Sequence, residues 1–490
     1  MPQGVLPYKY EEEKNKTGMT AFAGLPVYLD LASVLNLGES IAAHLQIKTQ
    51  GWSDEQIVLS LILLNLAGGN CVDDLRILEA DQGFCRILQR IELKGHPRKE
   101  RREMEKRWRK EKHRSVPSPS VVFRYLSAFH GDYVREEGKA IIPPLTELLS
   151  GLERVNRDLV AAINRQNPVN CATLDMDATL IQTDKLYALF SYKGYKAYQP
   201  LNTYWAEHGV VLHTEFRDGN VPAGYEQLRV FIHALSLLPA GIKTVRLRSD
   251  TAGYQHELLR YCNRKHPRFG RIEFSIGCDV TPEFRKAARE VDVWHPLLDK
   301  KGNVTGEWAE VCFVPNKSAT SKKEEPNRYI AIRERMRQPC LPTMDSLPFQ
   351  TITFDDTRYK LFGIVTNMDW EGNALIHWHH ERCGKSEEAH SVMKEDLAGG
   401  KLPSSLFGAN AAWWWIMILA HNLNVAMKSL VLEDAWVPKR MKAIRFHLIN
   451  LPGRIVEGSR ELLIRIAKGH PSLEVLCAAR QRIMEFVPSG

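Results

Sequence analysis

The segment LDMDATLIQTD, residues 174–184, carries two aspartates at alternate positions of an apolar stretch. In a strand, alternation turns Asp175, Asp177 and Thr179 to one side and the apolar residues between them to the other. A half-buried strand with a polar face accounts for this pattern without any chemistry. The chemical interpretations are a carboxylate that holds a metal ion or one that attacks phosphorus. Other parts of the chain must decide between them.

A second strand-like stretch, TVRLRSDTAG, ends in Asp250. Two aspartates at neighbouring strand ends can converge, and close carboxylates repel by about 1 kcal/mol in water at ~4 Å and several-fold more at lower effective dielectric. They therefore need a cation. Oxygen ligands favour Mg²⁺ or Mn²⁺, and a pair of such ions suits phosphodiester cleavage. A third acid is then expected.

Residues 377–400, HWHHERCGKSEEAHSVMKEDLAGG, supply that acid. The pattern predicts a helix that Ser386 caps and that Gly399 and Gly400 terminate. Glu387 and Lys394 are seven residues apart, about two helical turns, so a carboxylate and a cation are expected on one face. Glu388 is predicted to point more to the side, into solvent.

The elements before these residues divide into a helical and a strand-rich part. Residues from about 20 to 90 have helical periodicity, with Gly68 and Gly69 as a stop signal. From Val169 the pattern changes to strands, CATLDMDATL, YQPLNTYWAEHG and VVLHTEFRDG, which indicate an antiparallel meander. Short β patterns continue from about 260 to 375.

Between the helical and strand-rich parts lies the basic segment Lys94–Arg114, with eleven Lys or Arg against four Glu. One interpretation is a solvated helix or a linker. The other is contact with phosphates, through residues such as Arg107, Arg109 and Lys110. The helix candidate that follows SVPSPS would suit a DNA-reading module, although ordinary helical hairpins look the same.

Composition restricts the class of protein. The 490 residues predict two to four domains, and Lys plus Arg (66) exceed Asp plus Glu (58), with the excess concentrated, which favours a polyanionic partner such as DNA. Nine cysteines without CxxC pairs indicate neither a zinc knuckle nor a disulfide framework. We expect a cytoplasmic protein, because there is no signal pattern and AAWWWIMILA (411–420) is too short to span a membrane.

In their order, several of these pieces resemble the DDE transposases of bacterial insertion sequences, whose ribonuclease-H-like core is interrupted by a β-rich insertion between the second Asp and the Glu. The resemblance covers most of the chain. The pieces that carry it are LDMDATL, FRDGN, VRLRSDTAGY, FGANAAWWWIMILAHNL and RFHLINLPGR.

The resemblance implies that Asp177, Asp250 and Glu387 are catalytic and hold two Mg²⁺ ions, for which Mn²⁺ can substitute. It also implies that Lys394, and less directly Arg382 and Lys385, grip DNA phosphates. The implied partners are double-stranded DNA, as terminal inverted repeats and target, and a second copy of the chain in a homodimer on DNA. The resemblance further implies a nucleoid-associated location in the bacterial cytoplasm and no membrane partner.

The Tyr-Arg-Glu-Lys signature of this family maps only in part. Glu387 and Lys394 have the expected six intervening residues. Arg382, however, has one extra residue between itself and Glu387, and His379 stands where tyrosine is usual.

The expected fold is a multidomain α/β protein, with a ribonuclease-H-like mixed sheet and flanking helices, interrupted by a β-rich insertion and preceded by an all-helical N-terminal domain. The expected parts are a helical DNA-binding region (1–167), the first part of the core (168–258), the insertion (259–375), the second part of the core (376–440) and a C-terminal tail (441–490).

Two other functions compete with this one. Asp-x-Asp-x-Thr also matches haloacid-dehalogenase phosphatases, with Asp175 as nucleophile, Asp177 as its acid partner, and Asp355 and Asp356 as a later acidic pair. That family expects a parallel sheet, whereas the strands here follow one another with tight turns. The second alternative is a DNA-binding protein that has lost catalysis.

Aromatic and histidine side chains offer further candidates. Trp294 or Trp308 would be able to stack on an unpaired base, but core packing is the expected role of both. The tryptophans at 413–415 are expected in the core. The histidines at 377, 379 and 380 lack a zinc-like arrangement and are expected to be structural or to face DNA.

Overall fold

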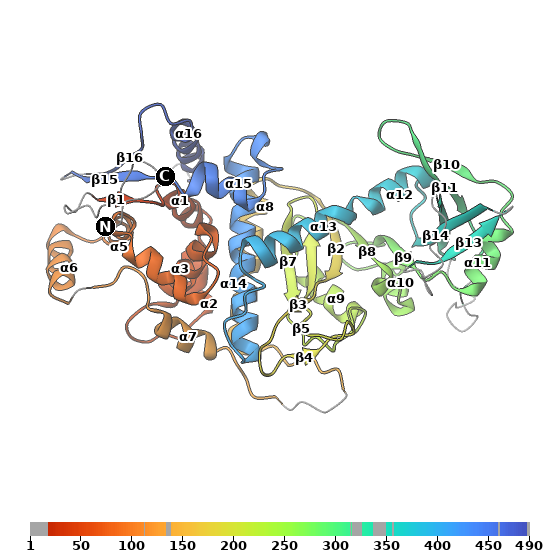
Figure 1. The fold of residues 1–490 in the computed structure, drawn as a ribbon, viewed down its shortest axis with the longest axis horizontal. Helices are drawn as coiled ribbons and strands as arrows, with labels where there is room; N and C mark the ends of the chain where they lie inside the picture. The colour runs from red at the N-terminus through yellow and green to blue at the C-terminus, as the bar shows by residue number, and fades with distance from the viewer. Residues whose placement is uncertain are drawn as a thin grey trace, which may run out of the picture. The chain divides into compact units, whose positions relative to one another are not determined.

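The computed structural model describes residues 18–111, 113–133, 139–313, 315, 326–336, 349–354, 357–458 and 461–487. The chain divides into two compact units (Figure 1). Unit 1 comprises Met1–Asp132, Leu145–Gln166 and Val392–Gly490, and unit 2 comprises Tyr133–Pro144 and Asn167–Ser391.

Unit 2 is built on one large mixed sheet, which has ten strands among the described residues. Its strand order is β10-β11-β12-β14-β9-β8-β2-β6-β7, and β13 pairs with β14 at one side of this path. In Figure 1, β10, β11, β13 and β14 gather at one end of the sheet, and β2 and β7 lie at the other. The strands are β2 (Cys171–Ala178), β6 (Leu201–Trp205), β7 (Val210–Glu215), β8 (Thr244–Ser249), β9 (Glu273–Cys278), β10 (His295–Leu298), β11 (Val304–Glu310), β12 (Arg328–Arg335), β13 (Thr351–Phe354) and β14 (Thr357–Thr366).

The direction of the strands changes at β2. β2, β6 and β7 form an antiparallel meander, as the sequence predicts, whereas β2, β8 and β9 are parallel. From β9 onward the neighbours β14, β12, β11 and β10 are antiparallel again. The strands of residues 259–375 therefore continue the sheet that contains the two aspartates.

β2 lies inside this sheet, between β8 and β6, and its residues 172–176 are all buried. Its polar side is therefore covered at Asp175 and becomes partly exposed at Asp177. α13 packs against β2, and α12 packs against β9. The helices of unit 2 are α9 (Gln227–Leu237), α10 (His256–Asn263), α11 (Pro282–Arg289), α12 (Gly372–His380) and α13 (Arg382–Ser391), with the 3-10 turn η2 (Thr251–Gly253).

A small second sheet leaves the end of β2. It has the order β3-β5-β4 and consists of β3 (Ile181–Gln182), β4 (Leu189–Phe190) and β5 (Lys196–Tyr198). The chain returns directly into β6, whose first residue Leu201 pairs with Ala178 at the end of β2.

Unit 1 is helical around α14 (Phe407–Ala426), which packs against α3, α7 and α8. Its tryptophans 413–415 are buried, as predicted, and Asn422 donates to Asn156 of α8 at 2.8 Å. The other helices are α1 (Pro26–Val34), α2 (Leu37–His44), α3 (Asp54–Ala67), α4 (Leu75–Ala80), α5 (Gln82–Glu92), α6 (Arg98–Glu111), α7 (Pro119–Ser127), α8 (Glu147–Gln166), α15 (Met441–Ile444) and α16 (Ser472–Glu485). Short 3-10 or π turns are η1 (Val72–Asp74), η3 (Val392–Asp396), η4 (Met427–Val431), η5 (Asp434–Trp436) and η6 (Arg445–Ile449), and β1 (Met19–Thr20), β15 (Gly453–Glu457) and β16 (Leu462–Arg465) form a small sheet.

The ends of α3 follow the sequence signals. Ser53 caps its start in a capping box with Gln56, and Gly68 ends it with φ of 104°. A φ of this sign strains any residue with a Cβ, which explains glycine at this position.

The predicted mixed α/β class is confirmed, whereas the five-part division of the chain stays a prediction. Among the described residues no single helix is long and apolar enough to cross a membrane, although the bent pair of Asp54–Ala67 and Val72–Ala80 meets that requirement together.

Candidate active site

Asp177 and Asp250 lie at the same end of two neighbouring strands. β2 and β8 are parallel, and Met176 of β2 pairs with Ser249 of β8. The residue after each of these two is one of the aspartates. Adjacent strands are separated by about 4.8 Å. The structure therefore brings these two predicted residues together, at the carboxyl ends of β2 and β8. Asp250 also accepts a hydrogen bond from the N–H of Ala252 at 3.0 Å, at the start of η2.

The electrostatics of this pair favour a cation beside it. Burial raises the pKa of Asp250, and the charge of Asp177 raises it further, whereas the guanidinium of Arg382 acts in the opposite direction. Two carboxylates at one strand edge are a donor set of hard oxygens. This set fits Mg²⁺ or Mn²⁺ by its chemistry.

Arg382 is the cation that the structure places beside these acids. Its Nη1 lies 3.4 Å from Oδ2 of Asp177, and its charge also acts on Asp250. The side chain is buried, and its Nε has no hydrogen-bond partner in the described part of the chain. A buried donor without a partner costs free energy unless an acceptor arrives. An anionic oxygen, such as one from a phosphate, would satisfy it.

Two further residues contact Asp177 or its neighbours, and sequence reasoning missed both. Asn202 is the register partner of Asp177 on β6, and its Nδ2 lies 3.1 Å from Nε2 of His390. Its Oδ1 accepts from the hydroxyl of Thr214 at 2.6 Å, which turns the Asn202 amide NH₂ toward His390. His390 Nε2 is then the acceptor. Its other nitrogen, Nδ1, carries the proton and faces Asp177 Oδ2 at 3.8 Å.

Glu387 lies on α13, three residues before His390, and is exposed. Glu388 is also exposed, and its charge acts on Tyr204 of β6, which is the register partner of Asp175. Glu388 is therefore exposed, as predicted, but it still lies close enough to the sheet for its charge to act on a residue of β6. Both glutamates belong to the helix that covers β2.

The predicted start and end of this helix are wrong. α13 begins at Arg382 and not at a Ser386 cap, and Gly384 within it has φ of 87°. The α-helix ends at Ser391, before the predicted glycine stop, and continues as the π-helical turn η3. The π turn is wider than an α-helical turn, so it changes the number of residues per turn after Ser391.

Lys385 and Lys394 occupy different parts of this segment. Lys385 is exposed on α13. Lys394 lies in η3, which belongs to unit 1. The two-turn spacing that predicts Glu387 and Lys394 on one face holds only for an uninterrupted α-helix, so the geometry gives it no support here.

Asp175 does not belong to the exposed part of the site. It is buried, and its two carboxylate oxygens accept from Nε and Nη2 of Arg248 at 2.6 and 2.9 Å. Burial raises its pKa, and the charge and hydrogen bonds of Arg248 act against that rise. A carboxylate that is enclosed and occupied in this way has a structural role. Asp355 and Asp356, the later acidic pair of the phosphatase alternative, lie outside the described residues.

The aromatic and histidine candidates also have packing roles. Trp308 is buried in an apolar cluster and contacts Gly372, where a Cβ would collide with its ring. Trp294 stacks on the guanidinium of Arg333 at 4.1 Å. His379 is buried and contacts the Ser275 hydroxyl at 3.0 Å, and burial lowers its pKa to about 3. Its burial and this contact indicate a structural role.

The basic segment forms α6, which Trp108 anchors by stacking on His113 at 5.0 Å between ring centroids. Arg107 is exposed on this helix. The side chains of Arg109 and Lys110 lie outside the described residues.

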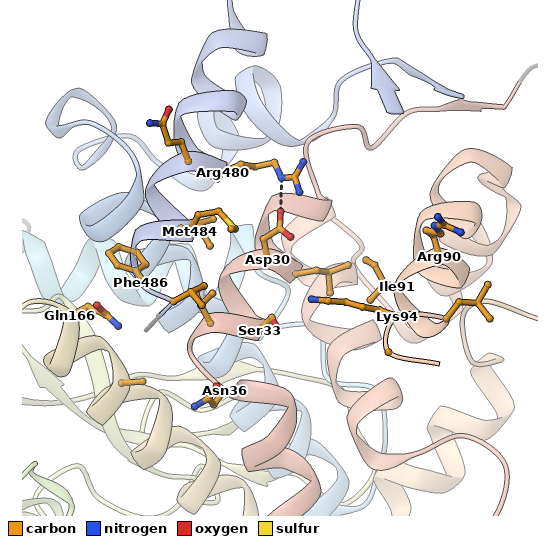
Figure 2. A pocket seen from close by; sticks show the side chains of 18 of the residues that line it. Asp30, Ser33, Asn36, Arg90, Ile91, Lys94, Gln166, Arg480, Met484 and Phe486 are labelled. Atoms are coloured by element: carbon orange, nitrogen blue, oxygen red, sulfur yellow. Dashed lines mark hydrogen bonds and ion pairs between the residues drawn. The ribbon is translucent and has the colours of Figure 1, made fainter. Parts of the chain in front are cut away.

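Unit 1 also contains a basic cavity of about 1100 Å³ (Figure 2). Among the described residues that line it, the acid is Asp30, which pairs with Arg480 at 2.9 Å, as the dashed line in Figure 2 shows. Met484 and Phe486 contribute apolar surface. The basic residues that line this cavity are Arg90, Lys94, Arg101, Arg165 and Arg480. The excess of positive charge suits an anionic ligand.

Comparison with known proteins gives a family match over nearly the whole chain. The model of a protein family described as transposase DDE domain group 1 matches residues 14–488. Among solved structures, the chain is similar to a piggyBac transposase in a synaptic complex with hairpin DNA, with 10% identity, a TM-score of 0.39, and coverage of 95% of this chain and 82% of that one. No curated protein matches the chain.

Proposed function

Because the chain belongs to the transposase DDE domain group 1 family, we propose that it is a cut-and-paste DNA transposase that cleaves the ends of its element and joins them to target DNA. The family match confirms the resemblance to DDE transposases that the sequence shows. The single observation that carries the catalytic proposal is the convergence of Asp177 and Asp250 at the carboxyl ends of β2 and β8.

A ribonuclease-H-like core is the fold that we propose around this site. The order β7-β6-β2-β8-β9 supports it. β7, β6 and β2 form an antiparallel meander, and the next two strands, β8 and β9, run parallel to β2. In this arrangement α13, which carries Glu387 and Glu388, packs against β2.

Asp177, Asp250 and Glu387 are proposed to hold two Mg²⁺ ions, with Mn²⁺ as a substitute. When bound, these ions would supply the Lewis acid and the activated water that phosphodiester cleavage needs. The two aspartates are fixed by their strands, and Asn202 and His390 hold the Asp177 side of the site in place. Glu387 is proposed to complete the site from α13, where it is exposed three residues before His390.

Arg382 is proposed to bind a phosphate oxygen of the scissile strand. Its unpartnered Nε and its place beside Asp177 support this role, since a guanidinium offers several donors in one plane. Lys385 would add charge on the exposed side of the same helix. In hydrolysis, water attacks phosphorus and the P–O3′ bond breaks, which leaves a 3′-hydroxyl and a 5′-phosphate. The freed 3′-hydroxyl then attacks a phosphodiester of the target, whose own P–O3′ bond breaks and releases a target 3′-hydroxyl.

Double-stranded DNA is the proposed partner of unit 1 as well. The exposed Arg107 of α6, together with Arg109 and Lys110 by sequence, and the basic cavity of Figure 2 support phosphate contact. Because two ends must be brought together before joining, we propose a homodimer assembled on DNA.

The phosphatase alternative is disfavoured by Asp175. A nucleophilic carboxylate must reach its substrate, whereas Asp175 is buried and both of its oxygens bind Arg248. The other alternative, a DNA-binding protein that has lost catalysis, can be distinguished from a transposase only by an assay of DNA cleavage.

The test is a nicking assay on a supercoiled plasmid that carries the ends of the encoding element. We expect cleavage that needs Mg²⁺ or Mn²⁺ and is lost in Asp177→Asn. Binding without any metal-dependent cleavage would favour the inactive protein, and phosphate-ester turnover that needs Asp175 would favour the phosphatase.

A further inference from the structure

The segment 179–200 exposes an unusual number of aromatic side chains. Tyr187, Phe190 and Tyr192 are 52%, 63% and 75% exposed, and Leu186 beside them is 67% exposed. Among the aromatic side chains that the structure describes, only one other, Phe446 of unit 1, is more than half exposed. We call the surface of Leu186, Tyr187, Phe190 and Tyr192 the aromatic ledge. Adjacent exposed apolar side chains of this size mark interaction sites.

The charge around the aromatic ledge is positive. Within residues 179–200, Lys185, Lys193 and Lys196 stand against one acid, Asp184. Lys193 Nζ lies 5.9 Å from the centre of the Tyr192 ring, and Lys196 donates to the carbonyl of Leu186 at 3.2 Å. Cations therefore lie directly beside the exposed rings.

The aromatic ledge is attached to the catalytic end of the sheet. The segment leaves β2 and returns to β6 at the pair Ala178 and Leu201, next to the pair Asp177 and Asn202. The first and last residues of the segment are joined, because the N–H of Thr179 donates to the carbonyl of Pro200 at 3.0 Å. The segment that carries the ledge thus begins within two residues of a proposed catalytic acid.

Its base is also held firmly. Tyr198 of β5 packs on Phe216 at 4.9 Å and forms a bridge with Asp218. Gly219 lies so close to the same strand that a Cβ would be 2.4 Å from the carbonyl oxygen of Ala197. These contacts give the small sheet a fixed position on the sheet that carries Asp177.

We propose that the aromatic ledge binds unpaired nucleotides of a DNA end beside the cleavage site, a proposal that rests on the proposed transposase function. Unpaired bases expose flat faces that stack on aromatic rings, and their phosphates attract lysines. Paired bases in a duplex do not offer these faces. A second copy of the ledge is a poor occupant, because it would bring two sets of three lysines together.

The experiment measures binding of the full chain to labelled DNA in EDTA, so that no DNA is cut. The probes are a blunt duplex and the same duplex with a four-nucleotide unpaired tail that contains 2-aminopurine. The variant is Phe190→Ala with Tyr192→Ala. Phe446→Ala is the matched control, because Phe446 is 76% exposed and lies in unit 1. Phe190→Trp with Tyr192→Trp keeps the aromatic faces.

We expect the wild type to prefer the tailed duplex and to quench 2-aminopurine. The double alanine variant should bind the tailed duplex about tenfold more weakly and keep its affinity for the blunt duplex. A tenfold loss lies at the lower end of what the loss of one or two stacked bases causes. The control and the double tryptophan variant should behave like the wild type.

Equal binding of the tailed duplex by the wild type and the double alanine variant would overturn the inference. So would a variant that changes only the oligomeric state in sedimentation experiments, since the ledge would then be a protein interface. A wild type that shows no preference for the tailed duplex but carries out metal-dependent nicking contradicts this inference alone, whereas a wild type that binds and cuts no DNA contradicts the proposed function.

Discussion

Arg248 and Asp175 form a buried, two-pronged ion pair between the two strands that carry the proposed catalytic aspartates. The third nitrogen of the same guanidinium, Nη1, donates to the carbonyl of Trp378 at 2.6 Å, near the end of α12. The pair thus ties β2 and β8 to the helix that precedes α13. Asp175 serves the active site by holding these three elements, two residues away from Asp177.

Asp175→Asn should strongly destabilise unit 2. The change leaves the Arg248 charge buried and poorly compensated, which costs about 3–5 kcal/mol of unfolding free energy. Urea unfolding measures this loss. Glu273→Gln is the matched control, because Glu273 pairs with Arg246 at 2.7 Å on the neighbouring strands but is partly exposed, so we expect about 1 kcal/mol or less. Equal losses in the two variants would contradict the proposed role of the pair.

His379 should make stability depend on pH. Its pKa is about 3 in the folded protein because of burial, against about 6.5 when unfolded. Above pH 6.5 both states are neutral at this residue, and below it only the unfolded state gains the proton, so stability falls with pH down to about 3. The slope is about 1.4 kcal/mol per pH unit, or about 2 kcal/mol between pH 6.5 and 5. His379→Gln should remove this part of the slope in urea unfolding at both pH values, and an unchanged slope would refute the assignment.

Arg382→Gln should strengthen metal binding and weaken cleavage. Removing a cation beside Asp177 and Asp250 lowers the repulsion of a divalent ion, so affinity for Mn²⁺ should rise several-fold in a calorimetric titration. Cleavage should fall, because the phosphate loses its donor. Lys385→Gln, exposed on the same helix, should leave Mn²⁺ affinity nearly unchanged. A fall in Mn²⁺ affinity in Arg382→Gln would show that this arginine supports the metal site and does not compete with it.

The basic cavity of unit 1 should contribute to DNA affinity through phosphates. The double variant Lys94→Glu with Arg165→Glu should reduce the slope of log affinity against log salt by roughly 0.9 for each phosphate that these side chains neutralise in the wild type. Fluorescence anisotropy on duplex DNA at several salt concentrations measures this slope. Arg76→Glu is the control, since Arg76 lies outside the cavity and is largely exposed beside Asp73. The same slope in both variants would remove the cavity from the DNA-binding surface.

The aspartates were predictable because their signal is local. Asp177 and Asp250 each end a short strand pattern, and strand alternation places Asp175 on the same side as Asp177. What alternation does not reveal is that this side is buried and that Asp175 is occupied by an arginine 73 residues away.

Asn202 and His390 were missed because their roles depend on pairing between distant segments. Asn202 faces Asp177 only through the β2–β6 register, and His390 joins them from a helix 188 residues further along the chain. The shared face of Glu387 and Lys394 was predicted from ideal α-helical spacing, which the π turn after Ser391 interrupts. The cavity escaped prediction because helices far apart in the sequence, from α1 to α16, supply its lining.

The proposed metal site is tested most directly by anomalous scattering from Mn²⁺ in crystals of the wild-type protein with an uncut DNA end analogue that resists cleavage. We expect Mn²⁺ peaks within coordinating distance of Asp177, Asp250 and Glu387, and their loss in Glu387→Gln but not in Glu388→Gln. Peaks bound elsewhere, or peaks that vanish only in Glu388→Gln, would contradict the proposed site.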